Sequence, residues 1–191
     1  MSEDSGSEPT RRRLNKRQSD TVDRLVEAAV VEVRATGYAK MTVRNVASRA
    51  DVAPATAYIY FSSKSHLIAE VFWRRLQSMP TPPSDEANRI DRVVSVLAGI
   101  ALLLSNEPEL SAACTSALLS EDPEVEPLRI RIGTDIRSRL VAALGEDYDP
   151  AELDTLQMLY SGALLHAGMG FLSYEKIVVS LQAAATLVLR R

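Results

Sequence analysis

Few side chains in this chain could carry out acid–base, nucleophilic or metal chemistry. Its 191 residues include two histidines, His66 and His166, and one cysteine, Cys114. The histidines are far apart in the chain, and no His-x-x-x-His, Cys-x-x-Cys or Glu-x-x-His spacing places metal ligands on one helix face. No glycine-rich phosphate loop occurs either. We therefore expect no enzyme and no cofactor, with His66 on the surface and His166 in an interface or core.

Side chains suited to binding phosphates and base edges are concentrated in residues 42–64, TVRNVASRADVAPATAYIYFSSK. Hydroxyl, guanidinium and ammonium groups are the donors that proteins direct at DNA. This segment supplies such donors at Tyr58, Tyr60 and Lys64. Double-stranded DNA is the partner that these residue types favour.

The charge distribution agrees with this interpretation but does not require it. Residues 10–64 hold eleven Lys and Arg against five Asp and Glu, whereas residues 65–191 hold eleven against seventeen. A basic N-terminal segment followed by an acidic remainder is typical of a protein that binds nucleic-acid phosphates with one end. Helical surfaces also vary in charge for no such reason, so charge alone leaves the partner open.

Apolar periodicity predicts a short helix over residues 42–50, with Thr42 as its N-cap. Its apolar side chains recur at i, i+3, i+4 and i+7 and share one face: Val43, Val46, Ala47 and Ala50. Residues 51–53 predict a tight turn, and Pro54 suits the first position of a second helix that ends near Phe61. Two short helices joined in this way form a helix-turn-helix.

The second helix of this pair would have to enter a major groove about 12 Å wide. Its leading residues, Pro54, Ala55 and Thr56, are small or polar enough to do so. A helical hairpin that is buried for packing alone would not require this order of residues beside a basic segment. We therefore interpret this pair of helices as a sequence-specific DNA-binding motif.

On these residues the chain resembles the TetR family of bacterial transcription regulators. Residues 50–64 (ADVAPATAYIYFSSK) follow a family pattern close to A-G-V-S-x-x-T-L-Y-x-Y-F-x-S-K. The direct matches are Thr56, Tyr58, Tyr60, Phe61, Ser63 and Lys64, with Thr42 and Arg44 matching upstream. The resemblance implies that Arg44, Thr56 and Tyr58 approach bases and nearby phosphates. It also implies that Thr42, Tyr60 and Lys64 hold the DNA backbone.

Four positions depart from the family pattern. Asp51 stands where Gly is usual, and Asp tolerates a left-handed turn better than most residues. Ala53 replaces a capping Ser, which costs about 1 kcal/mol of helix stability. Ala57 replaces Leu, and Ile59 lies where a larger polar or aromatic residue is common. These changes bear on the operator sequence and on the rigidity of the domain.

The whole chain is predicted to be all-α, because helical spacing recurs throughout and no alternating run indicates strands. We expect three parts: a flexible basic arm (1–17), a helix-turn-helix DNA-binding domain (18–63) and a ligand-binding and dimerisation domain (64–191). A proline-rich break at 80–84 precedes the later helices, the first of them capped by Ser84. Nine helices are expected, over residues 19–36, 42–50, 54–61, 64–79, 85–106, 108–120, 123–144, 150–173 and 174–190.

The basic arm is expected to be disordered in the free protein. Its cations are Arg11, Arg12, Arg13, Lys16 and Arg17. They could reach an adjacent minor groove or phosphates, or the arm could be a solubilising tail. The sequence leaves both alternatives open.

The family assigns the body of the chain to ligand binding and dimerisation. Candidate walls of a pocket for a small hydrophobic effector are Phe72, Leu76, Leu103, Cys114, Leu118 and Met158. For any one of these side chains, ordinary core packing is the more common role. Gly133 lies in the middle of a predicted helix. Either a ligand or another helix crosses closely at this position, or the glycine is simply exposed.

The last two helices suggest a homodimer. They carry small residues that let backbones approach closely: Gly162, Ala163, Ala167, Gly168, Gly170, Ala183, Ala184 and Ala185. The resemblance implies that two such helices from each subunit form a four-helix interface. It further implies a repressor that a small apolar ligand releases from its operator; the alternative is a helical protein-interaction scaffold without sequence-specific DNA binding.

The sequence also predicts a cytoplasmic location. The longest apolar run, residues 96–104, is far shorter than a membrane span, and no secretory signal is recognisable. A single cysteine cannot form an intramolecular disulfide and fits a reducing compartment.

Overall fold

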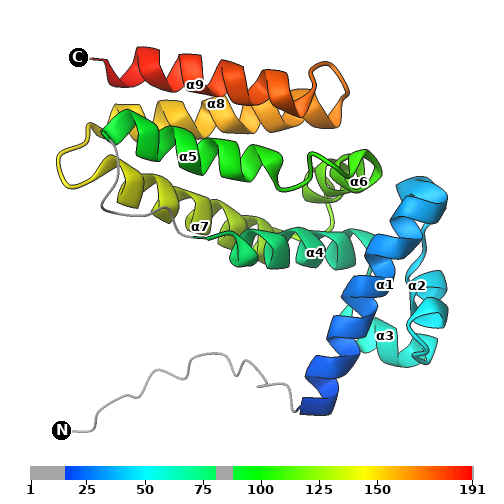
Figure 1. Ribbon diagram of the computed structural model, residues 1–191. Coiled ribbons are helices and arrows are strands. Elements are labelled where there is room, and N and C mark those ends of the chain that lie inside the picture. The colour runs from blue at the N-terminus through cyan, green and yellow to red at the C-terminus, as the bar shows by residue number, and fades with distance from the viewer. Residues whose placement is uncertain (1–15, 81–87, 191) are drawn as a thin grey trace, which may run out of the picture.

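The computed structural model describes residues 16–80 and 88–190, which are folded into nine α-helices with no strand (Figure 1). The all-α prediction is confirmed. The helices are α1 (Lys16–Lys40), α2 (Val43–Arg49), α3 (Pro54–Tyr60), α4 (Lys64–Ser78), α5 (Arg89–Leu102), α6 (Pro108–Leu118), α7 (Glu126–Leu144), α8 (Pro150–Gly168) and α9 (Tyr174–Leu189).

The first helix begins earlier than its sequence predicts, and it is broken at Gly37, directly after its predicted end. It begins at Lys16, so Lys16 and Arg17 are helical rather than part of a flexible arm. The remaining arm cations, Arg11, Arg12 and Arg13, lie outside the described residues. Near the other end, Gly37 has φ 74° and ψ 160°, which breaks the helix and redirects its last turn. Glycine is suited to this left-handed region because it has no Cβ.

Several other helix ends differ from the prediction because of local capping. Asn88 caps α5 by accepting hydrogen bonds from the backbone N–H groups of Ile90 and Asp91. The predicted cap at Ser84 lies outside the described residues. Helix α8 ends at Gly168 rather than near Ser173, because Gly170 follows with φ 75°.

The helices form two groups joined by α4 (Figure 1). Helices α1, α2 and α3 lie together at one end of the molecule, whereas α5, α7, α8 and α9 are stacked as a bundle. Helix α6 contacts α1, α4 and α8, so it lies where the two groups meet. One continuous apolar core extends from α1 through α4 to α9. This position makes α6 a physical link between the two halves.

Among the described residues, no helix combines the length and the apolar character that crossing a bilayer would require.

Candidate functional site

The turn between α2 and α3 has the geometry that the sequence predicts. Asp51 has φ 52°, the only positive φ of a non-glycine residue in the described chain. The Val52 N–H donates to the Ala47 carbonyl at 2.9 Å and closes the turn. Arg24 of α1 supports it, because its Nη1 donates to the carbonyls of Ala50 at 3.1 Å and Asp51 at 3.4 Å. The turn is therefore held from outside as well as by its own backbone.

Helix α2 is anchored to α1 by apolar packing and by one ion pair. Val43, Val46 and Ala47 are buried, as predicted. The Arg49 guanidinium donates through Nε at 3.0 Å and Nη2 at 2.8 Å to the Glu32 carboxylate. Glu32 is buried, so its charge needs this partner. This pair could not be predicted from the sequence, since its members lie on different helices.

Helix α3 presents its side chains outward. Only Ala57 is buried, while Pro54, Ala55, Tyr58 and Ile59 are exposed. No side chain caps the helix at Ala53, and Pro54 is its first residue, as expected. The geometry is that of a helix available to a DNA groove rather than packed inside the protein.

The polar residues predicted to bind DNA have different surroundings. Thr42 is exposed and caps α2, accepting a hydrogen bond from the Asn45 N–H at 3.1 Å. Arg44 is exposed and makes no ion pair within the described residues. Thr56 is half-buried, and Tyr60 is half-buried against the core.

The Lys64 ammonium group is already engaged within the protein. Its Nζ donates to the Tyr38 carbonyl at 2.8 Å and the Ala39 carbonyl at 3.3 Å, and it lies 4.5 Å from the centre of the Tyr38 ring. Lys64 thus ties the start of α4 to the end of α1. An ammonium has three N–H donors, so one remains available beyond these two carbonyls. Its predicted role at the DNA backbone stays a prediction.

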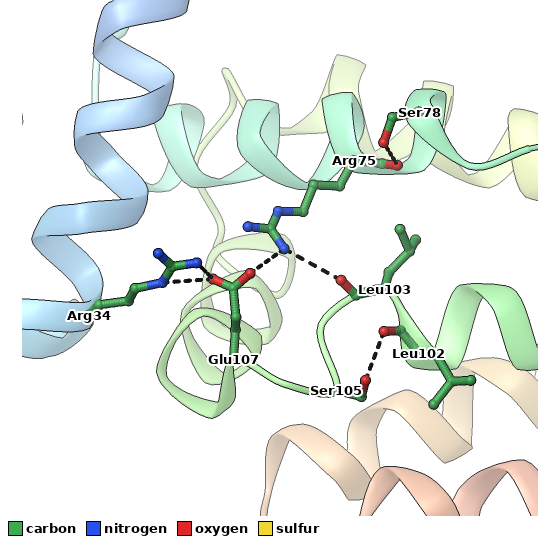
Figure 2. Close-up of polar contacts among 7 residues, drawn as sticks. All are labelled: Arg34, Arg75, Ser78, Leu102, Leu103, Ser105 and Glu107. Atoms are coloured by element: carbon green, nitrogen blue, oxygen red, sulfur yellow. Dashed lines mark hydrogen bonds and ion pairs between the residues drawn. The ribbon is translucent and has the colours of Figure 1, made fainter.

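Glu107, the N-cap residue of α6, joins three helices (Figure 2). Its Oε2 accepts from Arg34 of α1, with Nη2 at 2.5 Å and Nε at 2.9 Å, and its Oε1 lies 2.5 Å from Nη1 of Arg75 on α4. That same Nη1 is 3.5 Å from the Leu103 carbonyl. Desolvation by itself would raise the pKa of Glu107, but the hydrogen bonds from Arg75 and Arg34 outweigh it and hold the pKa below its usual value. We call Arg34, Arg75 and Glu107 the junction cluster.

The body encloses a largely apolar cavity of about 270 Å³. Its walls come from α4 to α9: Phe72, Ile100, Ala101, Leu104, Ser111, Cys114, Thr115, Leu118, Leu119, Arg129, Ile132, Gly133, Ile136, Tyr160, Ser161, Leu164, Leu165 and Tyr174. Helix α6 and the residue that follows it contribute five of these residues. A pocket of this kind, with a few polar groups among apolar walls, is typical of small-molecule sites.

Three of the six predicted pocket residues line the cavity: Phe72, Cys114 and Leu118. Leu76 does not, because it is fully buried among other core side chains. Leu103 lies in the turn after α5, half-buried against the core. Met158 is 73% exposed, and apolar spacing alone could not show that it faces away from the cavity.

Gly133 of α7 lines the cavity. A Cβ built there would meet no atom within 4 Å, so the missing side chain leaves open space above this helix. No neighbouring helix crosses closely at Gly133, so its place in the cavity wall is the feature that distinguishes it. Tyr160 and Ile136 also line the cavity, which apolar spacing could not predict, because their direction depends on how α7 and α8 pack.

Burial favours the neutral form of the thiol and of the two tyrosine hydroxyls in the cavity wall. Burial raises the pKa of the Cys114 thiol to about 12, with Arg75 acting weakly in the opposite direction. Burial also raises the pKa of the Tyr160 and Tyr174 hydroxyls. Tyr174 shares a hydrogen bond with Ser111. Arg129 is the one charged residue of the wall, and its Nη1 donates to the carbonyls of Leu118 at 2.9 Å and Ser120 at 3.0 Å.

A second exposed surface lies on α8, α9 and their connection. Its large apolar side chains are Met158, Met169, Phe171, Val179 and Leu187, each more than half exposed. A Cβ at Gly162 would meet nothing within 4 Å, as expected for a position that faces a partner. Gly168 differs, since a Cβ there would lie 2.2 Å from Thr115 Oγ1. Its small size therefore serves packing against α6 inside the subunit rather than the predicted interface.

Both histidines contact an aromatic ring. His66 is half-buried, with its ring 5.4 Å from that of Phe61 in an edge-on arrangement. His166 is exposed on α8, 5.9 Å from the Phe171 ring, so its predicted place in a core is wrong for the subunit, and its place in an interface stays a prediction.

Comparison with known protein sequences gives consistent results. Residues 25–71 match the profile of the bacterial regulatory proteins of the tetR family. The chain is 44% identical over 177 residues to an uncharacterized HTH-type transcriptional regulator of Mycobacterium tuberculosis, covering 92% of this chain and 83% of that protein. It is 30% identical over 139 residues to the HTH-type transcriptional repressor KstR of Rhodococcus jostii, covering 71% of this chain and 64% of KstR.

Solved structures share the fold. A TetR transcriptional regulator from Rhodococcus sp. RHA1 superposes with a TM-score of 0.76 at 25% identity, covering 92% of this chain and 98% of that chain. The regulator FadR of Bacillus subtilis, solved in complex with stearoyl-CoA, superposes with a TM-score of 0.63 at 17% identity, covering 87% and 96%. Both similarities extend over the helix-turn-helix and the helical body.

Proposed function

Because the chain belongs to the TetR family of bacterial transcription regulators, we propose that it is a dimeric repressor released from its operator by a small lipophilic ligand. The observation that carries the proposal is the position of α6, which walls the cavity and is joined through Glu107 to α1 and α4. Repression is supported by the similarity to KstR, which is named a repressor.

The DNA-binding surface in this proposal is formed by the exposed parts of α2 and α3. Arg44, Thr56 and Tyr58 contact bases or adjacent phosphates, while Thr42, Tyr60 and the remaining Lys64 donor hold the backbone. Pro54 and Ala55 allow close approach to the groove. A two-fold dimer would present two such surfaces about 34 Å apart, one helical repeat of DNA.

The dimer interface in this proposal is the exposed apolar surface of α8 and α9. Side chains such as Met158 and Leu187, 73% and 78% exposed, would be covered by the same helices of a second subunit. Apolar surface of this extent is unusual on a monomer and typical of a partner site. A two-fold axis makes such a surface complementary to itself.

The character of the cavity wall restricts the ligand. Its residues include no Asp or Glu, and Arg129 is the only cation. A cationic ligand would lose its hydration without gaining a counter-charge, which is costly in an apolar site. We therefore propose a neutral or anionic lipophilic ligand. The similarity to FadR, which was solved with stearoyl-CoA, supports an acyl compound as the first candidate.

Release would depend on α6 and α4 together. A ligand that fills the cavity pushes on Cys114 and Leu118 of α6 and on Phe72 of α4. Movement of α6 carries Glu107 with it and disturbs the junction cluster, which tilts α1 and changes the spacing of the two reading helices. Coupling of about 1–3 kcal/mol would lower operator affinity roughly 5- to 150-fold.

The test begins with the operator. Genomic fragments retained by the purified full-length protein are sequenced, and the best fragment is titrated in gel-shift assays at several salt concentrations. We expect specific binding whose affinity falls steeply with salt, since several phosphates are neutralised. Fatty acids, acyl-CoA esters, neutral lipophiles and a lipophilic cation are then added in turn. Equal binding of random duplex would refute the regulator, and no release by any of these compounds would refute ligand control.

A further inference from the structure

The outermost face of α3 is aliphatic. Successive residues of an α-helix are rotated by about 100°, so Ala55 and Ile59 both lie about 160° from the buried Ala57. They therefore form the middle of the face that points away from the domain. Ile59 is 76% exposed, while Tyr58 beside it is 51% exposed. An isoleucine this exposed gains nothing from the core of its own subunit.

The side chains of α3 exclude the usual bidentate readers of bases. Its sequence, PATAYIY, contains no Arg, Lys, Asn, Gln, Asp or Glu. Guanine and adenine are commonly recognised in the major groove by paired hydrogen bonds from Arg, Lys, Asn or Gln, and α3 cannot make them. Arg49 and Lys64 lie nearer in the sequence, but Arg49 is paired with Glu32 and Lys64 donates to the Tyr38 and Ala39 carbonyls. Arg44 and Asn45 of α2 are exposed and belong to residue types that can make such bonds. The middle of α3 can therefore make only aliphatic contacts with DNA, through Ala55 and Ile59.

Thymine is the base that such a face can recognise, since it alone carries a methyl group, on C5, in the major groove. We propose that Ile59 selects the operator by packing against thymine C5-methyl groups. The surrounding charge suits DNA as the occupant of this face, because Lys40 just before the helix-turn-helix and Arg44 within it are exposed cations. This inference rests on the proposed operator binding and adds the base feature that the operator must carry.

The size of the effect follows from the burial of one methyl group. Removing one methyl from a buried apolar contact weakens binding about fourfold. Replacing thymine by uracil deletes that methyl and keeps the Watson–Crick edge. Duplexes with uracil in place of every thymine of both half-sites should therefore bind at least about fourfold more weakly than the natural operator.

The experiment uses the full chain and the operator fragment selected from the genome. Dissociation constants for the thymine and uracil duplexes are measured by fluorescence anisotropy for the wild-type protein, Ile59→Ala and Ile130→Ala. Ile130 is 64% exposed on α7, outside the helix-turn-helix, and receives the same substitution as a matched control. Circular dichroism confirms folding, which neither exposed substitution should disturb.

We expect the wild type and Ile130→Ala to prefer thymine about fourfold or more, and Ile59→Ala to bind both duplexes alike. Equal affinity of the wild type for the two duplexes would overturn the inference, although operator binding would stand. A thymine preference retained by Ile59→Ala would also overturn it, since another residue would then read the methyl groups. If the protein binds no genomic fragment specifically, the proposed function, on which this inference rests, is refuted instead.

Discussion

Glu107→Gln is the substitution that tests the junction cluster most directly. In the structure one carboxylate oxygen accepts from Arg34 and the other from Arg75. The glutamine side chain has the same shape, but its amide nitrogen is a donor, so one of the two arginines must lose its acceptor. The change therefore weakens the link between α6 and the DNA-binding helices without emptying any space.

The magnitude can be estimated from the exposure of the three side chains. Arg34 is 51% exposed, so its pair with Glu107 contributes at most about 1 kcal/mol. The side chains of Arg75 and Glu107 are 28% and 15% exposed, and their hydrogen bond is worth more. A total of about 1–2 kcal/mol corresponds to a factor of roughly 5–30 in an equilibrium constant. If the cluster is intact only in the operator-binding state, operator affinity falls by up to that factor.

Operator binding and ligand binding are thermodynamically linked, so Glu107→Gln should change both affinities, in opposite directions. A substitution that shifts the protein toward the released state must weaken operator binding and strengthen ligand binding together. Operator affinity is measured by gel shift without ligand, and ligand affinity is measured by calorimetry without DNA. Glu109→Gln is the matched control, because Glu109 lies in the first turn of the same helix and is exposed. We expect Glu109→Gln to change neither affinity.

Two outcomes would contradict a coupling role for the junction cluster. If Glu107→Gln binds operator as tightly as the wild type and is still released by ligand, the cluster does not couple the two sites. If both affinities fall together while thermal stability drops, Glu107 only stabilises the fold.

Four further predictions concern the cavity, the packing, the dimer and pH. Gly133→Leu should abolish ligand binding in calorimetry and leave operator affinity unchanged, because the new side chain extends into open cavity space. Gly168→Ala should lower the free energy of unfolding by about 1–3 kcal/mol in urea titration, because its Cβ overlaps Thr115; an unchanged stability would contradict the close packing of α8 on α6. Leu187→Asp should yield monomers in sedimentation experiments if α9 forms the interface, since it buries a charge there. The folded-state pKa of Glu107 is depressed, so the stability that its carboxylate contributes is present above an unfolded pKa of about 4.3 and is lost as the pH falls through the lower folded value. The difference in free energy of unfolding between the wild type and Glu107→Gln should therefore be constant near neutral pH and shrink only in acid.

Local features of the fold could be predicted well from the sequence. The cap at Thr42, the start at Pro54 and the left-handed Asp51 all follow from interactions within about four residues. The first helix begins earlier than predicted, at Lys16, whereas Gly37 breaks it directly after the predicted end at residue 36. Helix ends elsewhere were misplaced by a few residues, because local caps and positive-φ glycines determine them.

The site was only partly predictable, because its residues come from distant segments. Cys114 and Leu118 line the cavity as expected, whereas Met158 has similar chemistry and points outward. Apolar periodicity identifies the buried face of a helix but does not distinguish a core contact, a cavity wall and a subunit interface. That distinction depends on how neighbouring helices pack.

The sequence by itself determined that this chain is helical and that residues 42–64 form a helix-turn-helix of the TetR type, since caps, turns and periodicity act over short distances. Only the tertiary structure decided what the charged side chains do. It pairs Glu107 with Arg34 and Arg75, and it turns the Lys64 ammonium toward two backbone carbonyls. The physical reason is that a buried or half-buried charge must find a partner in space, and the packing of the helices determines which partner is within reach.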